Sequence, residues 1–129
     1  MREPGAHVLI ADDDPVIVRL LELNFRLAGF RVSTASRGDT AVERALELEP
    51  DVIVIDVNMP GIDGYEACSR LRREHGMTHV PIVMLTAHSP DDDAARAADL
   101  GVTDYVTKPF DPESLVAVVR SALATEATP

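Results

Sequence analysis

Five short runs of apolar and β-branched residues recur along the chain, and a helical pattern of apolar and polar positions follows each of them. The runs occupy residues 7–11, 31–35, 52–55, 81–85 and 104–106. Runs that are apolar at consecutive positions are typical of strands buried on both faces of a parallel sheet. The pattern therefore predicts an α/β fold, a doubly wound three-layer sandwich around a parallel five-stranded sheet with right-handed crossovers.

Capping residues and helix breakers set the expected helix boundaries. Helices are expected at residues 15–28, 36–49, 65–75, 89–101 and 111–124. Asp14 is expected to cap the first helix, with Pro15 at its first position. Ser36 and Asp39 have the spacing of a capping box for the second helix, and Asp63 is expected to cap the third.

Two of the most apolar strands end on carboxylates. Asp12 and Asp13 follow the run at 7–11, and Asp56 follows the run at 52–55. Ligands of open parallel sheets bind outside the carboxyl ends of the strands, and neighbouring strands lie ~4.8 Å apart. The three carboxylates should therefore converge on one ion. A set this small suits Mg²⁺, which takes one or two carboxylates and keeps several waters.

The last two expected strands add a hydroxyl and an ammonium group at the same edge. The fourth strand runs into Thr86, and the fifth runs into Lys108, the only lysine among 12 basic residues. A phosphorylated carboxylate needs a metal ion, a hydroxyl donor and a positive charge around its oxygens. A surface lysine without a role is the alternative that Lys108 alone does not exclude.

Composition narrows the class of protein. A length of 129 residues and a net charge of −10 indicate one globular domain that does not bind nucleic acid or an anionic membrane directly. The chain has no apolar run long enough for a membrane span and no apolar signal-peptide core, so a cytoplasmic location is expected. Cys68 is expected to pack in the core. His7, His75 and His79 are expected on the surface or in loops.

Four motifs together resemble the receiver domain of two-component response regulators. They are DDDP after the first strand, DVNMPGIDG after the third, LTA at the fourth and TKPF after the fifth. The resemblance covers residues 7–124, which leaves 125–129 as a tail or the start of a linker to a single domain of 1–129. It implies a flavodoxin-like strand order of 2-1-3-4-5.

The resemblance implies a role for each residue of the acidic site. Asp56 would be the phosphoacceptor. Asp12, Asp13, Asp56 and the backbone carbonyl of Asn58 would hold Mg²⁺, for which Mn²⁺ could substitute.

Further roles follow from the same resemblance at the other strand ends. Thr86 and Lys108 would bind the phosphoryl oxygens, and the peptide bond between Lys108 and Pro109 would be cis. Tyr105 would move inward with Thr86 as a switch of the face formed by the fourth helix, the fifth strand and the fifth helix. Asn58 and His88 would tune the lifetime of the aspartyl phosphate.

The implied function is signalling. A histidine kinase or a histidine phosphotransfer protein would donate phosphoryl to Asp56 in a Mg²⁺-dependent reaction, and slow self-dephosphorylation would follow. The domain would not be an enzyme that turns over an external substrate. Residues 102–120 are close to winged-helix transcription regulators, but Thr103 and Val118 depart from the charged dimer face of that subfamily. A phosphorylation-dependent homodimer and the identity of the effector therefore stay open.

Two alternatives stay open from the sequence. A dehalogenase-like, Mg²⁺-dependent phosphatase also uses an aspartate nucleophile, but it needs a second acid two residues later, where this chain has Asn58. Asp12 and Asp14 have that spacing, but Asp14 is expected to be a helix cap. A receiver-like adaptor without phosphorylation is disfavoured, because no part of the site is missing.

Overall fold

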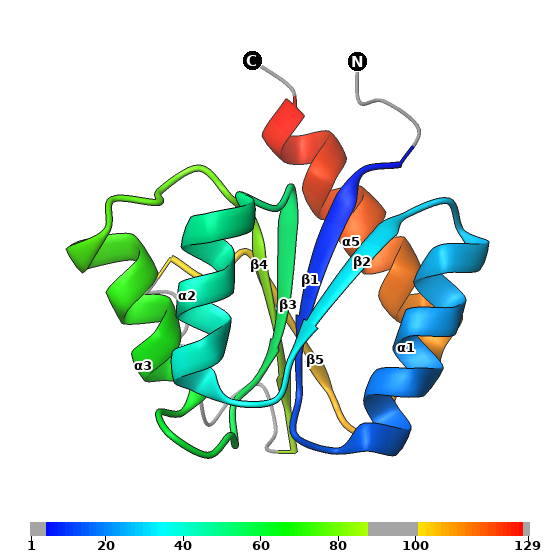
Figure 1. Cartoon of the computed structure of the whole chain (residues 1–129). Helices are drawn as coiled ribbons and strands as arrows, with labels where there is room; N and C mark the ends of the chain where they lie inside the picture. Colours follow the sequence, from blue (N-terminus) through cyan, green and yellow to red (C-terminus); the bar gives the residue numbers. More distant parts are fainter. Residues whose placement is uncertain (1–4, 88–100, 128–129) are drawn as a thin grey trace.

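The computed structural model describes residues 5–87 and 101–127, and within them five parallel strands form the middle of three layers (Figure 1). The strands are β1 (His7–Ala11), β2 (Arg31–Ala35), β3 (Val52–Asp56), β4 (Ile82–Thr86) and β5 (Asp104–Thr107). Their spatial order is β2-β1-β3-β4-β5. This is the order and the fold class expected from the sequence, with strand ends that differ by one residue.

The central strands are buried on both faces, which explains their apolar sequences. Every residue of β1, β3 and β4 is buried. Because successive side chains of a strand point to opposite faces, Leu9 and Ile53 enter one core cluster, whereas Val8 and Val54 enter the other. Each face therefore needs its own covering layer of helices.

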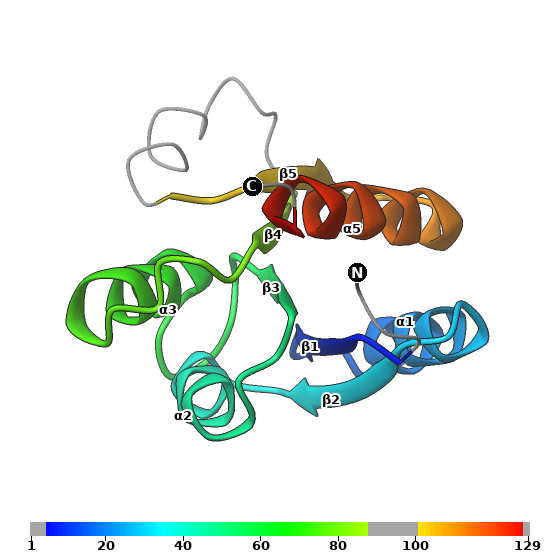
Figure 2. The ribbon, with the colours of Figure 1, turned by 90° about the horizontal axis from the view of Figure 1, so that it is seen from above.

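Among the described residues, two helices cover each face of the sheet (Figure 2). The helices are α1 (Pro15–Leu27), α2 (Gly38–Leu48), α3 (Gly64–Ser69) and α5 (Pro112–Ala127), and α3 continues into a π-helical turn, η1 (Arg70–Glu74). Leu21 and Phe25 of α1 share a core cluster with Leu115 and Val119 of α5. α2 and α3 pack on the opposite face. The helix expected at 89–101 lies outside the described residues.

Three acidic residues cap helices as their local sequence suggests. Asp14 Oδ1 accepts from the Val16 N–H at 2.9 Å, and Asp63 Oδ1 accepts from the Glu66 N–H at 2.8 Å. Asp111 Oδ2 accepts from the Ser114 N–H at 3.1 Å. Each cap satisfies a backbone donor that the first helical turn leaves without a partner.

The expected capping box of the second helix is wrong. α2 begins at Gly38, two residues later than expected, and its N-cap is Arg37, which makes no capping hydrogen bond through its side chain. The Gly38 N–H donates instead to the Pro60 carbonyl at 3.0 Å. A tertiary contact with the loop after β3 thus replaces the local cap of Ser36 and Asp39.

The third helix also departs from the expected regular helix to residue 75. Its last turn is π-helical, and the His75 N–H donates to the carbonyl of Arg70. The Arg72 guanidinium donates to the carbonyls of Met77, Val80 and Gly101 at 2.7–2.8 Å. Arg72 lies within this widened turn, and its side chain holds both the loop before β4 and the segment before β5.

His7 is buried and not at the surface, contrary to the expectation. Its ring Nε2 lies 2.7 Å from the Ser33 Oγ on β2, and its backbone N–H donates to the Asp51 carboxylate. His7 opens the fully buried β1, so its burial follows from the strand that contains it. Cys68 is buried in the core as expected.

Within the described residues, no helix combines the length and the apolar character that crossing a membrane requires.

Candidate functional site

Three carboxylates meet at the carboxyl edge of the sheet. One oxygen each from Asp12, Asp13 and Asp56 lies within 4.8 Å of the others. The parallel pairing sets this proximity, because Ala11 of β1 pairs with Ile55 of β3 and the acids follow directly. Asp12 and Asp56 are buried, whereas Asp13 is exposed. The structure thus brings together the three acids that the sequence predicted.

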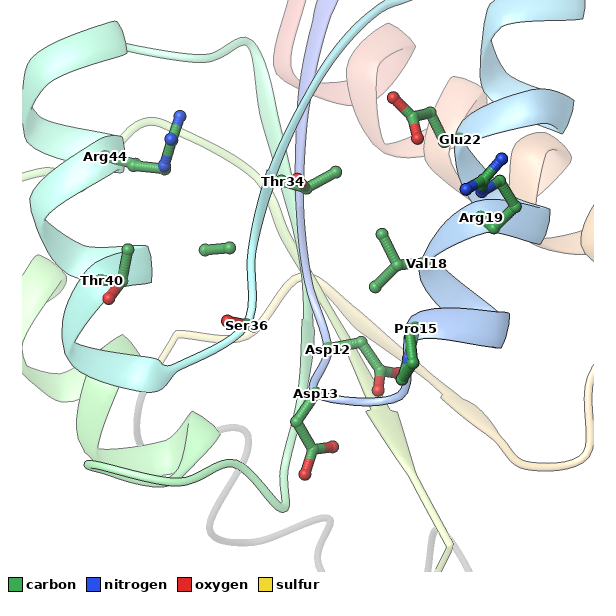
Figure 3. Close-up of a pocket in the computed structure, with 11 residues that line it drawn as sticks. Asp12, Asp13, Pro15, Val18, Arg19, Glu22, Thr34, Ser36, Thr40 and Arg44 are labelled. Atoms are coloured by element: carbon green, nitrogen blue, oxygen red, sulfur yellow. The ribbon is translucent and has the colours of Figure 1, made fainter.

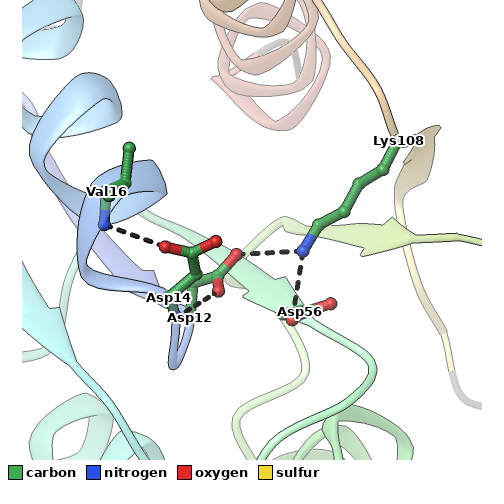
Figure 4. Close-up of polar contacts among 5 residues, drawn as sticks. All are labelled: Asp12, Asp14, Val16, Asp56 and Lys108. Atoms are coloured by element: carbon green, nitrogen blue, oxygen red, sulfur yellow. Dashed lines mark hydrogen bonds and ion pairs between the residues drawn. The ribbon is translucent and has the colours of Figure 1, made fainter.

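Lys108 reaches into this cluster from the loop after β5 (Figure 4). Its Nζ lies 3.3 Å from Asp12 Oδ2 and 3.2 Å from Asp56 Oδ2, so one ammonium bridges two buried carboxylates. The Lys108 N–H donates to the Thr86 carbonyl at 2.7 Å, and the Lys108–Pro109 peptide bond is cis. The lysine is therefore part of the acidic site and not an isolated surface residue.

Burial and charge act against each other in this cluster. Burial raises the pKa of Asp56 above its ordinary value and the Asp12 carboxylate adds to this, while Lys108 and the Asn58 N–H oppose it. Burial alone would lower the pKa of Lys108, but the carboxylates of Asp12 and Asp56 outweigh it and raise that pKa. The ammonium stays charged, and Asp56 is a carboxylate that gains from a further cation.

Asp12 and Asp13 differ in the hydrogen bonds and ion pairs that they make with the protein. Asp12 Oδ1 accepts from the Asp14 N–H at 2.9 Å, and its other oxygen faces Lys108. In the part of the chain that the structure describes, Asp13 makes no hydrogen bond or ion pair. Asp13 can therefore turn to a ligand without losing a protein contact.

The loop after Asp56 is held in close contact by glycines. A Cβ on Gly38 would lie 1.9 Å from the Ile62 carbonyl oxygen, and a Cβ on Gly64 would lie 2.4 Å from the Asp56 carbonyl oxygen. The first residues of α2 and of α3 thus lie in close contact with the segment that carries Asn58. Asn58 itself is exposed beside the cluster.

The predicted switch residues lie on the next two strands. Thr86 is buried at the end of β4 and pairs with Thr107 of β5. Tyr105 is half-buried and packs against the core cluster under α2 and α3. His88 lies outside the described residues, so its expected tuning role stays a prediction.

An exposed apolar row along α1 was missed in the sequence. Val16, Leu20, Leu23 and Leu27 are 73%, 43%, 55% and 79% exposed, and their spacing of 4, 3 and 4 residues places them on one helical face. The buried Leu21 and Phe25 lie on the opposite face. The sequence of α1 has two apolar faces, and this pattern could have predicted the exposed row. A helix that only covers a sheet needs a single apolar face.

The fold and the acidic site at the strand ends define a signalling receiver. The chain belongs to the response regulator receiver domain family, whose profile matches residues 8–120.

Among curated proteins, the chain is similar to transcription regulators. The chain is 41% identical over 116 residues to the DNA-binding dual master transcriptional regulator RpaA of Synechocystis sp., which covers 90% of this chain and 48% of that protein. The chain therefore spans about half the length of the curated relatives it matches. The other half of such a relative lies outside the matched region, and its activity is not assigned to this chain.

Two solved structures are similar over nearly the whole chain. A putative response regulator from Chloroflexus aurantiacus has a TM-score of 0.86 and 38% identity, covering 93% of this chain and 98% of that one. The receiver domain of sensor histidine kinase PA1611 from Pseudomonas aeruginosa has a TM-score of 0.84 and 31% identity, with the same coverage. That structure has a magnesium ion coordinated in its active site cleft.

The donor set of this chain fits such an ion. Three carboxylates converge, one of them without a protein partner among the described residues, and oxygen-only ligands suit a hard divalent cation. Receiver domains bind Mg²⁺ at an acidic site and work with histidine kinases and effector domains.

Proposed function

We propose that Asp56 accepts a phosphoryl group from a phosphohistidine of a histidine kinase or phosphotransfer protein. The observation that carries this proposal is the Lys108 ammonium, which lies 3.2 Å from Asp56 inside a cluster of three carboxylates. An ammonium at that distance can neutralise the oxygens of a phosphoryl group on Asp56. Asp56 is therefore one of two acids, with Asp12, that face this ammonium, and it lies next to the proposed cation site.

The phosphoryl transfer to Asp56 needs few protein side chains. An Asp56 carboxylate oxygen attacks phosphorus, the new P–O bond forms as the P–N bond breaks, and the donor imidazole keeps the electron pair and takes up a proton. Lys108 then meets the phosphoryl oxygens, and Thr86 is the proposed hydroxyl donor. Positioning and charge stabilisation supply most of the rate in phosphoryl transfer.

The proposed metal ligands are Asp12, Asp13, Asp56 and the backbone carbonyl of Asn58. Bound Mg²⁺, or Mn²⁺ in its place, would neutralise negative charge on the phosphoryl oxygens. Asp13 would turn toward the ion, while the Asp14 N–H holds Asp12 through a hydrogen bond of 2.9 Å. Tyr105 and Thr86 are the proposed switch, and Asn58 and His88 the residues proposed to tune the phosphate lifetime.

A phosphatase that turns over external substrates is less well supported. The residue two positions after Asp56 is Asn58, which is not an acid and cannot protonate a leaving group. Asp14, two positions after Asp12, is engaged as the cap of α1. The self-directed chemistry of a signalling domain therefore fits these residues better.

The exposed row on α1, formed by Val16, Leu20, Leu23 and Leu27, is the proposed contact for the phosphodonor. It begins at Val16, two residues after the Asp14 cap, so this end of the row lies next to the segment that carries Asp12 and Asp13. A helical partner on this row would bring its phosphohistidine near Asp56. Aliphatic side chains with 43–79% exposure gain most from such a contact.

Incubation with a small acyl phosphate and Mg²⁺ tests the proposal. Intact-mass measurement should find one added phosphoryl group on the wild type and none on Asp56→Asn, with slow hydrolysis of the group and no turnover of a generic phosphomonoester. Steady turnover of the phosphomonoester would favour the phosphatase, and equal labelling of both proteins would remove Asp56 from its proposed role.

A further inference from the structure

A pocket of about 330 Å³ lies along β2, on the side of the sheet away from β1 (Figure 3). One wall comes from α1 with Val18, Arg19 and Glu22, and the other from α2 with Thr40 and Arg44. β2 forms the floor, and Asp12 and Asp13 line one end. Because α1 and α2 cover opposite faces of the sheet, the pocket is a trench that follows a sheet edge.

Each wall carries an arginine with an uncompensated charge. Neither Arg19 nor Arg44 makes an ion pair or a side-chain hydrogen bond with the residues that the structure describes. Of the three acids in the trench, Glu22 pairs with Arg26 at 3.1 Å and Asp12 pairs with Lys108, and Asp13 at one end makes no ion pair with either arginine. Two guanidinium groups thus face an open trench in a chain of net charge −10.

The outer edge of β2, which includes Thr34 of the trench floor, has backbone groups that bond to no described strand. The Arg31 N–H donates to Ala6 and the Ala35 carbonyl accepts from Asp12, so residues 31, 33 and 35 turn their backbone groups inward. Alternate residues of a parallel strand turn the other way, so Val32 and Thr34 direct N–H and C=O groups out of the sheet. β2 pairs with β1 alone, and no described strand covers this edge.

We propose that this trench binds an extended acidic peptide segment of a partner protein, which adds to the sheet as a strand beside β2. Backbone hydrogen bonds to Val32 and Thr34 would give affinity. Successive side chains of the added strand point to opposite faces, so two consecutive acidic residues would meet Arg19 on α1 and Arg44 on α2. The structure thus assigns both a binding mode and a sequence preference.

The two ends of the trench differ in charge. Asp13 at the carboxyl end of the strands repels an anion, so the acidic pair must sit at the level of the two arginines. A small anion could pair with the same guanidinium groups, but it would not use the backbone of β2. The dependence on that backbone therefore separates the peptide from a free anion.

Two isomeric peptides test the sequence preference by amide NMR titration. Ac-Thr-Val-Glu-Glu-Val-Thr-NH₂ places its glutamates on opposite faces, whereas Ac-Thr-Glu-Val-Glu-Val-Thr-NH₂ places them on one face at equal charge and composition. The first should bind up to about fivefold more tightly, the effect of one additional exposed ion pair. Its shifts should centre on Val32 and Thr34, and Asp56→Asn should bind it equally well.

Variants test the two contacts separately. Arg19→Gln and Arg44→Gln should each remove the preference between the peptides, and Arg70→Gln, on η1 and outside the trench lining, should retain it. Thr34→Pro removes an outward N–H without touching the β1 ladder and should abolish binding, whereas Thr34→Val should not. Equal binding of both peptides, binding that survives Thr34→Pro, shifts centred elsewhere, or the same shifts from inorganic phosphate alone would overturn the proposal.

Discussion

Lys108 holds two buried carboxylates with a single ammonium group at 3.2–3.3 Å. Arginine in its place would keep the charge but present a planar fork of different reach. We expect Lys108→Arg to retain part of the labelling by acyl phosphate and to lose the response of β5 to phosphorylation. Amide NMR of Tyr105 and its neighbours before and after labelling measures that response. A normal response in the arginine variant would mean that charge alone matters, with Lys108→Met as the uncharged control.

His7 gives the fold a dependence on pH. Burial lowers its pKa below 6.5, the Arg31 charge lowers it further, and Asp51 opposes both. A depressed histidine pKa means that the unfolded chain binds more protons, so stability is complete above pH 6.5 and falls below it. Thermal melting should therefore show a steeper loss between pH 6.5 and the folded pKa in the wild type than in His7→Gln. Equal slopes would mean that another group causes the loss.

Some residues could be placed from sequence and others could not. Asp12, Asp13 and Asp56 were predictable, because strand ends in a parallel sheet converge whatever the details of packing. The bridge from Lys108 to both buried acids was not, since it depends on a loop conformation. The polarity of His7 favours a surface position, but its place at the start of the buried strand β1 decides its burial.

At the scale of the element, α1 has more apolar surface than folding requires. We expect the double variant Leu20→Ser and Leu23→Ser to slow phosphotransfer from a histidine kinase that phosphorylates the wild type. Labelling by a small acyl phosphate should not change, because exposed substitutions alter stability by only about 0.5 kcal/mol.

Leu46→Ser on α2 is the matched control for that α1 variant. Leu46 is 38% exposed, close to the 43% of Leu20, but lies off the row. A kinase reaction that is unaffected by the α1 variant, or equally slowed by Leu46→Ser, would contradict docking on α1.

The helices also mark the limit of local sequence rules. Asp14, Asp63 and Asp111 cap their helices because each cap needs only residues within three positions. The start of α2 is set instead by contact between Gly38 and the loop after β3, more than 20 residues later. A capping box at Ser36 was locally sound and was overridden by that contact.

At the scale of the whole molecule, the acidic site opposes folding until a cation binds. Asp13 adds a third negative charge to a cluster with one lysine, so Asp13→Asn should melt higher than wild type in chelator. The gain should be below about 1 kcal/mol per charge pair, because Asp13 is exposed and Lys108 already compensates Asp12 and Asp56.

Magnesium should reverse the order of stability of the wild type and the Asp13→Asn variant. At a concentration 100 times its Kd, the ion stabilises the wild type by about 2.7 kcal/mol, and the variant much less. Melting curves at increasing Mg²⁺ should therefore approach or cross. A variant less stable than wild type in chelator would show that Asp13 has a structural partner.

The architecture followed from the sequence because its signals are redundant. Five apolar runs, five helical patterns and short connections all favour one doubly wound sheet, so an error at one helix start does not change the fold. The trench beside β2 could not be predicted this way, because Arg19 and Arg44 meet only through the tertiary placement of α1 and α2.

The most direct test of the central claim locates the phosphoryl group. After incubation with acyl phosphate and Mg²⁺, borohydride reduces an aspartyl phosphate to homoserine, which marks the acceptor by mass spectrometry of peptides. We expect homoserine at residue 56 alone, and none when Mg²⁺ is removed by chelator. Homoserine at residue 12 or 13, or a base-stable phosphate on serine or threonine, would contradict Asp56 as the phosphoacceptor.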